Sequence, residues 1–568
     1  MQNKFKLREL LKFEDFIAVI IFSVISIVVI AFQSSRIFSL WDFTNYTDLA
    51  ARILAGQIPY KDIPLYTQPG SFVDIAISYV LFGKNVQGIY FFIFIKQILT
   101  GIFILKIINL VSKLKFQQKI FLTIMISLVN SWSIVPQPTY DADLSFALIF
   151  STWVLIRTFK NLNPLKFQDY ILLALCIWLP LWYKQSSGLT WLLFSHVFLI
   201  IFSIKFKKIS ILKFISIFDL LLFSIVYWIN FRTSLVSDWY KWAVQMPLEA
   251  RLTQNRTPIA QFMGLLEYRD LFLLILILTI FLFISIRLFR KKIPIVIILF
   301  ISISVIIVDF VRNSWGKITY LEMNWDRLIA PIIVSIFIYI FVAILFGKES
   351  SFIKLINLGL FATIVSNYLA QGIVGSSYAF FPLYLLIIFL SSYSYFDIRE
   401  HYSLGKIKFS SIYSFSILLI TLAVGYYSFS TIRMAYVRFD EPIHRYSKLY
   451  GWIGMPGKYL EETQIGIDLF KEFSSKGLTA VWPGEDPVSL FTSKIPATEV
   501  SLSDQTTNPY FEDVRGWLKR NDIKYVVLKT RLQTPGQHQI SIDKFVEANK
   551  DFKEIKQVGV YLVLERIN

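Results

Sequence analysis

The sequence predicts a mainly α-helical, polytopic membrane protein with a small α/β domain after its last span. Three observations predict this fold class. Of the 568 residues, 55% are hydrophobic and only 17% are charged. The apolar residues form repeated runs of about 18–22, long enough to cross the hydrocarbon core of a bilayer. Near residue 432 this pattern stops. We therefore expect a helical bundle over residues 1–432 and a second domain over residues 433–568.

About thirteen spans are predicted. The first is longer than the core of a signal peptide and no small-residue cleavage motif follows it, so we expect it to be retained. The predicted spans are residues 16–34, 88–111, 118–135, 139–159, 168–183, 186–204, 210–229, 270–287, 293–311, 327–346, 352–370, 378–396 and 409–430.

The orientation of the spans is predicted from Lys and Arg, which recur in every second connection. Such basic connections lie in the cytoplasm. We therefore expect a multi-pass protein of the cell membrane, with a cytoplasmic N-terminus and an extracytoplasmic C-terminal domain. The net charge of +18 lies almost wholly in the membrane part, because residues 431–568 hold 19 Lys and Arg against 18 Asp and Glu. The charge thus indicates topology and contact with anionic lipid, and it gives no reason to expect a nucleic-acid partner.

Two long connections are expected on the outer side, at about residues 33–87 and 231–269. The first contains an amphipathic stretch at residues 46–54, with Leu49, Ile53 and Leu54 on one face. It also contains an apolar segment at residues 64–82, which Pro69-Gly70 interrupts. We expect this segment to lie along the membrane interface without crossing it.

The C-terminal part alternates β-rich runs with amphipathic helical patterns, which predicts a small α/β domain that binds the acceptor or has a structural role. The expected strands are residues 479–482, 525–528 and 558–563. The expected helices are residues 464–473, 510–519 and 542–549.

Several kinds of chemistry find no support in the sequence. The one cysteine, Cys176, lies inside a predicted span, where core packing is the expected role. None of the four histidines has the spacing of a metal site, and no glycine-rich phosphate-binding loop occurs. ATP-driven transport and the use of a nucleotide sugar at a soluble dinucleotide-type site are therefore disfavoured.

Asp42 is the first candidate site residue, because it stands where the first span ends. A carboxylate at the membrane surface is a functional candidate by default; the alternative is an N-cap of the following helix. Lys184 stands at the end of a span that is expected to face the outer side, whereas most other basic residues lie in the connections expected in the cytoplasm. A phosphate partner would explain it, and so would snorkelling of its side chain to the interface.

Other charged residues are candidates with open alternatives. Asp141 and Asp143 could bind a divalent cation, orient an acceptor, or cap the following span. Asp48 and Asp62 are expected as solvated loop acids. In the second outer loop, Arg256 could bind phosphate together with Arg251 and Arg269, or each could be a surface charge.

A resemblance to a known superfamily connects these residues. The first outer loop resembles that of GT-C membrane glycosyltransferases, the group that includes protein O-mannosyltransferases and lipid A aminoarabinose transferases. The resemblance is carried by an acid after the first span, a Tyr and small residues on a helix, and a G-x-x-P-Y turn. Further segments that resemble the group are the juxtamembrane segment ending in L-F-G, T-Y-D-A-D-L and W-Y-K-Q-S-S-G-L. The residues of the first pattern are Asp42, Tyr46, Ala50, Leu54, Gly56, Pro59 and Tyr60, with Asp62 after them.

The resemblance implies a hexosyl- or pentosyltransferase that uses a polyprenyl-phosphate sugar and a hydroxyl of a glycolipid, polysaccharide or protein. Asp42 would act as general base, while Lys184 and Arg256 would bind the donor phosphate. Asp141, Asp143 and Asp48 would serve the acceptor or a divalent cation. The first loop departs from the pattern, since D-F-T-N supplies one acid where many members have two. The alternatives are a transporter or flippase, or a ligase or polymerase, of lipid-linked glycans; the clear paired halves of many transporters are absent from the sequence.

Overall fold

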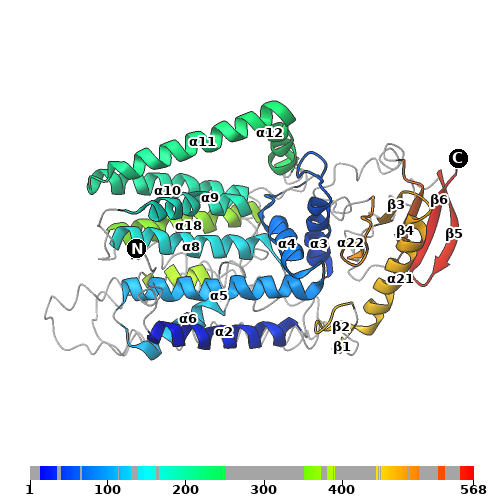
Figure 1. Ribbon diagram of the computed structural model, residues 1–568, viewed down its shortest axis with the longest axis horizontal. Helices are drawn as coiled ribbons and strands as arrows, with labels where there is room; N and C mark the ends of the chain where they lie inside the picture. Colours follow the sequence, from blue (N-terminus) through cyan, green and yellow to red (C-terminus); the bar gives the residue numbers. More distant parts are fainter. Residues whose placement is uncertain are drawn as a thin grey trace, which may run out of the picture.

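The structure is a computed structural model. Apart from short gaps, it describes residues 13–34, 40–112, 114–128, 138–160, 165–249, 351–371, 380–390, 443–497, 522–530 and 551–567. Over these residues the chain forms a bundle of long helices followed by a smaller α/β unit (Figure 1). The predicted boundary between two domains at residue 432 lies outside the described residues.

Long helices occupy eight of the predicted span positions, and they run side by side in Figure 1. Among the described residues, α5, α8, α10 and most of α11 are long and apolar enough to cross a membrane. Their bounds are α2 (Phe13–Ser34), α5 (Val86–Val111), α6 (Phe116–Ser127), α8 (Tyr140–Lys160), α9 (Phe167–Tyr183), α10 (Gln185–Lys205), α11 (Ile209–Thr233) and α18 (Ser351–Gln371).

Two of the predicted spans, that of α6 and that at residues 378–396, are described only in part. The helix α6 ends at Ser127, whereas the predicted span continues to residue 135 and so beyond the described part. Helical residues also occur between positions 380 and 390. The spans predicted at residues 270–287, 293–311, 327–346 and 409–430 lie outside the described residues.

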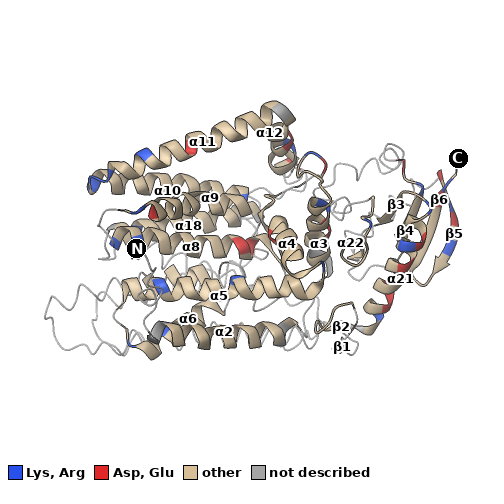
Figure 2. Cartoon of the chain, viewed as in Figure 1, with Lys and Arg blue, Asp and Glu red and all other residues tan. Residues whose placement is uncertain are grey.

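The connections of the bundle alternate between two ends. The basic residues at the end of α8, the start of α9 and the end of α10 gather at one end (Figure 2). At the opposite end lie α3 (Leu40–Leu54) and α4 (Gly70–Phe82), followed by the α/β unit (Figure 1). This alternation is the pattern from which the topology was predicted.

The first outer connection is largely helical. The predicted amphipathic stretch is part of α3, in which Leu49 is fully buried but Leu54 is exposed. The expectation that both share one face is wrong, because five residues advance a helix by well over one turn. The helix α4 starts after Pro69 and has 13 residues, so at about 20 Å it is too short to cross a bilayer core. In the second outer connection, α12 (Leu235–Trp239) and a π-helical turn (Tyr240–Gln245) follow α11.

The α/β unit contains a four-stranded sheet in the order β3-β4-β6-β5, in which β3 and β4 are parallel and the other pairs antiparallel. The helix α21 packs against the sheet, and Phe470 and Val527 lie in the apolar core between them. The strand predicted at residues 558–563 is wrong: two strands meet there in a hairpin, and Gly559 takes a positive φ at the turn. The elements are β1 (Ile443–His444), β2 (Met455–Pro456), α21 (Gly457–Ser474), β3 (Thr479–Trp482), α22 (Val488–Phe491), β4 (Tyr525–Lys529), β5 (Phe552–Val558) and β6 (Tyr561–Arg566).

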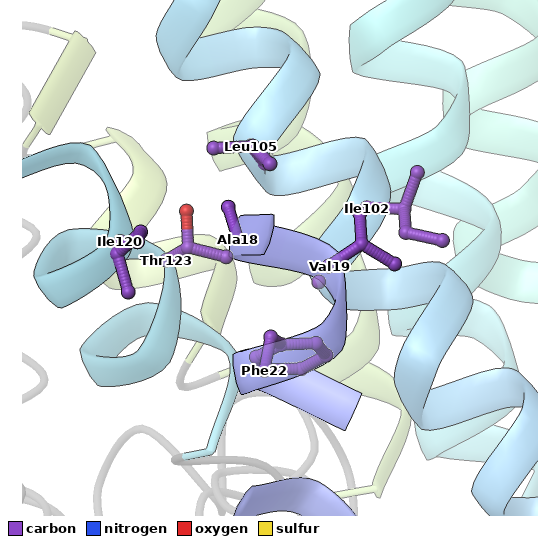
Figure 3. Close-up of a pocket in the computed structure, with 8 residues that line it drawn as sticks. Ala18, Val19, Phe22, Ile102, Leu105, Ile120 and Thr123 are labelled. Atoms are coloured by element: carbon purple, nitrogen blue, oxygen red, sulfur yellow. The ribbon is translucent and has the colours of Figure 1, made fainter. Parts of the chain in front are cut away.

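A small apolar pocket lies where α2, α5 and α6 meet (Figure 3). Phe22 of α2 reaches it, and Gly101 of α5 allows the ring to come close to the helix backbone. The pocket has no room for a water molecule and is lined by apolar side chains and Thr123. It is part of the helix packing, and among the described residues no charged side chain lines it.

Candidate active site

The first part of the candidate site is the N-terminal half of α3. The structure places the backbone of Asp42 in the first turn of this helix, four residues before Tyr46. Residues four apart share one face of a helix. Tyr46 is buried, and its hydroxyl accepts a hydrogen bond from the backbone N–H of Tyr140 at 2.7 Å. Tyr46, one helical turn after Asp42, therefore contacts the start of α8, while the side chain of Asp42 lies outside the described part of the structure.

The second part is the first turn of α8, which holds Asp141 and Asp143. The Thr139 hydroxyl accepts a hydrogen bond from the N–H of Ala142 at 3.2 Å, as an N-cap residue does. Acidic side chains in the first turn also interact favourably with the helix dipole. Both carboxylates are nevertheless buried, with exposures of 8% and 3%, so the dipole alone does not account for them.

The third part is the turn between α9 and α10, where Lys184 precedes Gln185 in an extended backbone conformation. Its Nζ lies 2.7 Å from Oδ1 of Asp141 and 4.9 Å from the centre of the Tyr140 ring. Lys184 is only 4% exposed. Snorkelling to water therefore does not describe this side chain, since the ammonium is held against a carboxylate and an aromatic face.

A second charged cluster, which the sequence analysis did not assign, lies beside this pair. Lys96 of α5 contacts Asp74 of α4 at 2.5 Å and Asp143 at 2.6 Å. The hydroxyl of Tyr183 donates to the same Asp74 oxygen at 2.9 Å. The cluster therefore connects α4, α5, α8 and α9. The signal that could have identified it is Lys96 itself, because a lysine in the middle of an apolar span needs a buried partner.

The remaining candidates lie elsewhere. Asp48 is 2% exposed in α3 and forms an ion pair with Arg52 at 2.8 Å, so the expectation of a solvated loop acid is wrong. This part of α3 is buried because apolar residues of the helix pack against apolar residues of the C-terminal unit. Asp62 is exposed and accepts the N–H of Ile58, as expected of a loop acid. Arg256 lies outside the described residues, as do Arg251 and Arg269.

A divalent cation, one of the alternatives for Asp141 and Asp143, does not fit the carboxylates that the structure describes at this place. A metal would need several carboxylate oxygens on one point. Instead Asp141 and Asp143 each face a different lysine, Lys184 and Lys96, at 2.7 and 2.6 Å. Among the described residues no three His, Cys, Asp or Glu side chains come together in a way that could hold a metal. No chemical step below is assigned to a metal.

The site thus has a lysine paired with a carboxylate in the first turn of α8. Tyr46 of α3, one turn after Asp42, contacts the residue before that carboxylate. Figure 2 shows the acidic residues of α4 and α8 at this end of the bundle, away from the basic end. Such buried charges near a membrane surface suit the binding of a charged lipid-linked group.

Comparison with known proteins adds little to this geometry. No known protein family matches the chain, and no curated protein matches its sequence. Among solved structures, the chain is similar to ArnT from Cupriavidus metallidurans, whose crystal structure contains undecaprenyl phosphate. The match covers 97% of this chain and 98% of ArnT, at 12% sequence identity and a TM-score of 0.45. A similarity this low carries no argument about activity, so the function is argued from the residues themselves.

Proposed function

We propose that this protein is an integral membrane glycosyltransferase. It transfers a sugar from a polyprenyl-phosphate donor to a hydroxyl group of an acceptor on the outer face of the membrane. The supporting observation is the junction of α3, α8 and the α9–α10 turn. There Tyr46, one turn after Asp42, contacts the backbone of Tyr140, and the next residue, Asp141, pairs with Lys184. The motif resemblance to GT-C enzymes, described above, points to the same residues.

In the proposed reaction, Asp42 accepts the proton of the acceptor hydroxyl. The hydroxyl oxygen forms a bond to the anomeric carbon while the bond from that carbon to the phosphate oxygen breaks. The electron pair of this bond leaves with the polyprenyl phosphate. Attack from the face opposite the phosphate inverts the anomeric centre.

Lys184 stabilises the negative charge that develops on the departing phosphate. Its ammonium, held beside Asp141 at 2.7 Å, would donate a hydrogen bond to an oxygen of the bound phosphate. Asp141 would then hold the lysine in place between turnovers. Arg256 is a further proposed phosphate ligand, on the second outer loop.

The test is transfer from a labelled polyprenyl-phosphate sugar in proteoliposomes. Asp42→Asn should lower the transfer rate by about 100-fold or more, because the proton acceptor is lost. Asp62→Asn is the matched control, since Asp62 is an exposed acid of the same loop, and it should leave transfer unchanged. Lys184→Met should raise the apparent donor constant. Unchanged transfer by Asp42→Asn would remove Asp42 from the mechanism.

The same proteoliposomes distinguish the enzyme from a flippase. A flippase would move the labelled sugar lipid between leaflets without an acceptor and without forming a glycosidic bond. A glycosyltransferase releases polyprenyl phosphate and forms a new glycoside only when an acceptor hydroxyl is present. Leaflet exchange without any glycoside product, across a range of acceptors, would favour the flippase.

A further inference from the structure

The C-terminal unit contacts α3, the helix on which Asp42 lies. Figure 1 shows α3 between the bundle and α22, and α22 packs directly against α3. Tyr450, Ile453 and Leu490 of the C-terminal unit belong to the same buried apolar cluster as Leu49 of α3. The two parts of the chain therefore share a core at this place.

A buried arginine joins the two parts by hydrogen bonds. The Nε of Arg52 donates to Asp48 at 2.8 Å, while its Nη2 donates to the backbone carbonyl of Pro496 at 2.7 Å. Both charged side chains are 2% exposed. A guanidinium offers donors in a fixed planar arrangement, so one side chain can serve a carboxylate and a carbonyl at the same time. Arg52 therefore connects α3 to the segment that follows α22.

A second cation contacts the same segment. The Nζ of Lys84, in the turn after α4, donates to the carbonyl of Thr492 at 2.9 Å. Burial lowers the pKa of Lys84, and the nearby carboxylate of Asp48 opposes that shift. The buried carboxylate of Asp48 thus interacts with Arg52 and Lys84, which each contact the segment of residues 492–496.

The opposite side of α3 is fixed to the bundle by the hydrogen bond between Tyr46 and Tyr140. Tyr46 and Arg52 lie six residues apart on α3, so one helix of 15 residues is held from the bundle and from the C-terminal unit. Asp42 lies one turn before Tyr46. The position of Asp42 relative to α8 therefore depends on how α3 is held at both contacts.

We infer that Arg52 is a positioning residue: its contact with Pro496 docks the C-terminal unit on α3, and this docking sets the position of α3 for transfer. The docking half of the inference stands on the contacts alone. The second half rests on the proposed function, because it concerns the placement of the proposed base.

Hydrogen exchange of the full-length protein tests the docking without any assay of activity. Arg52→Met should raise the amide exchange of residues 488–497 about tenfold or more, the effect expected for one lost charge-assisted hydrogen bond. Arg52→Lys should not restore the protection of these amides from exchange. A lysine ammonium cannot reproduce the planar guanidinium, which donates to Asp48 and to the Pro496 carbonyl at the same time. Lys61→Met, which removes an exposed positive charge of the same loop, is the matched control and should leave exchange unchanged.

Arg52→Met leaves Asp48 buried without this partner, which could impair folding. The double variant Asp48→Asn with Arg52→Met removes both charges, so no unpaired charge is left buried. Amide exchange of residues 488–497 should rise in this variant as well. Unchanged exchange of residues 488–497 in a folded variant would overturn the docking role of Arg52.

Steady-state transfer tests the positioning half. In the double variant, kcat should fall by about tenfold to a hundredfold, since small displacements of a reacting group have effects of this size. The apparent donor constant should stay unchanged, because Lys184 lies on another element. Increased exchange with unchanged kcat would overturn the positioning role. An inactive wild-type protein would instead overturn the proposed function, while the exchange result would still decide the docking.

Discussion

At the level of single residues, the candidate site consists of lysines and carboxylates that form buried ion pairs with one another. The described cluster has three carboxylates, Asp74, Asp141 and Asp143, and two lysines, Lys96 and Lys184. Withdrawing such charges from water is costly, and paired geometry with further hydrogen bonds offsets the cost. A chain that needed only a stable bundle could place apolar residues here. The charges therefore indicate a role in binding or chemistry.

Lys96 provides a residue-level test of this cluster. Lys96→Met should destabilise the protein by about 3–5 kcal/mol, because it leaves two buried carboxylates without their shared cation. The measurement is unfolding of the purified protein in detergent. Replacing Asp74 and Asp143 by Asn in the same variant removes the uncompensated charge and should recover a large part of the loss. Equal stability of Lys96→Met and wild type would contradict the role given to this lysine.

Residue-level prediction from the sequence was incomplete for a physical reason. Asp141, Asp143 and Lys184 could be chosen because each stands near the end of an apolar run. Which acid faces which lysine depends on the rotation and depth of α5, α8 and α9, and local sequence does not set these. Asp48 was misjudged for the same reason, since the segment that buries it follows more than 400 residues later, at Pro496.

At the level of elements, long apolar runs predicted helices well. The start and end of α5, α9 and α10 lie within two residues of the predicted span limits, because the periodic apolar pattern and the flanking polar residues both mark those limits. Short elements were harder. The β5–β6 hairpin resembles one strand in the sequence because only two residues, beginning with Gly559, separate the two strands.

The packing of α2 on α5 offers an element-level test. A Cβ added at Gly101 would lie 2.1 Å from a ring carbon of Phe22, and the adjoining pocket has no free space to receive the ring. Gly101→Ala should therefore destabilise the bundle by about 1–3 kcal/mol, as overpacked cores do. Adding Phe22→Leu should relieve the clash, and the double variant should be more stable than Gly101→Ala alone in thermal unfolding. Without that recovery, the close contact of these helices would be refuted.

At the level of the whole molecule, the two ends of the helical bundle differ in charge and in what is attached to them. Basic residues gather at one end of the bundle, while the candidate site, α3, α4 and the C-terminal unit lie at the other (Figure 2). If basic ends face the cytoplasm, the site lies at the end of the bundle near the outer leaflet, next to the C-terminal unit. This arrangement would let a lipid-linked donor arrive from the membrane while an acceptor arrives from the aqueous side.

Thiol labelling of variants that each gain one surface cysteine tests this orientation. Cys176 is fully buried, so a new surface cysteine can be labelled against a low background. In right-side-out membrane vesicles, an impermeant maleimide should label Lys61→Cys, in the turn after α3, and Lys476→Cys, in the C-terminal unit. Lys160→Cys, exposed at the basic end of α8, should react only after the membrane is permeabilised. Charge bias requires this result, because the basic end is retained in the cytoplasm during insertion. Labelling of position 160 in sealed vesicles, with protection of positions 61 and 476, would place the candidate site on the cytoplasmic face and exclude transfer at the outer leaflet.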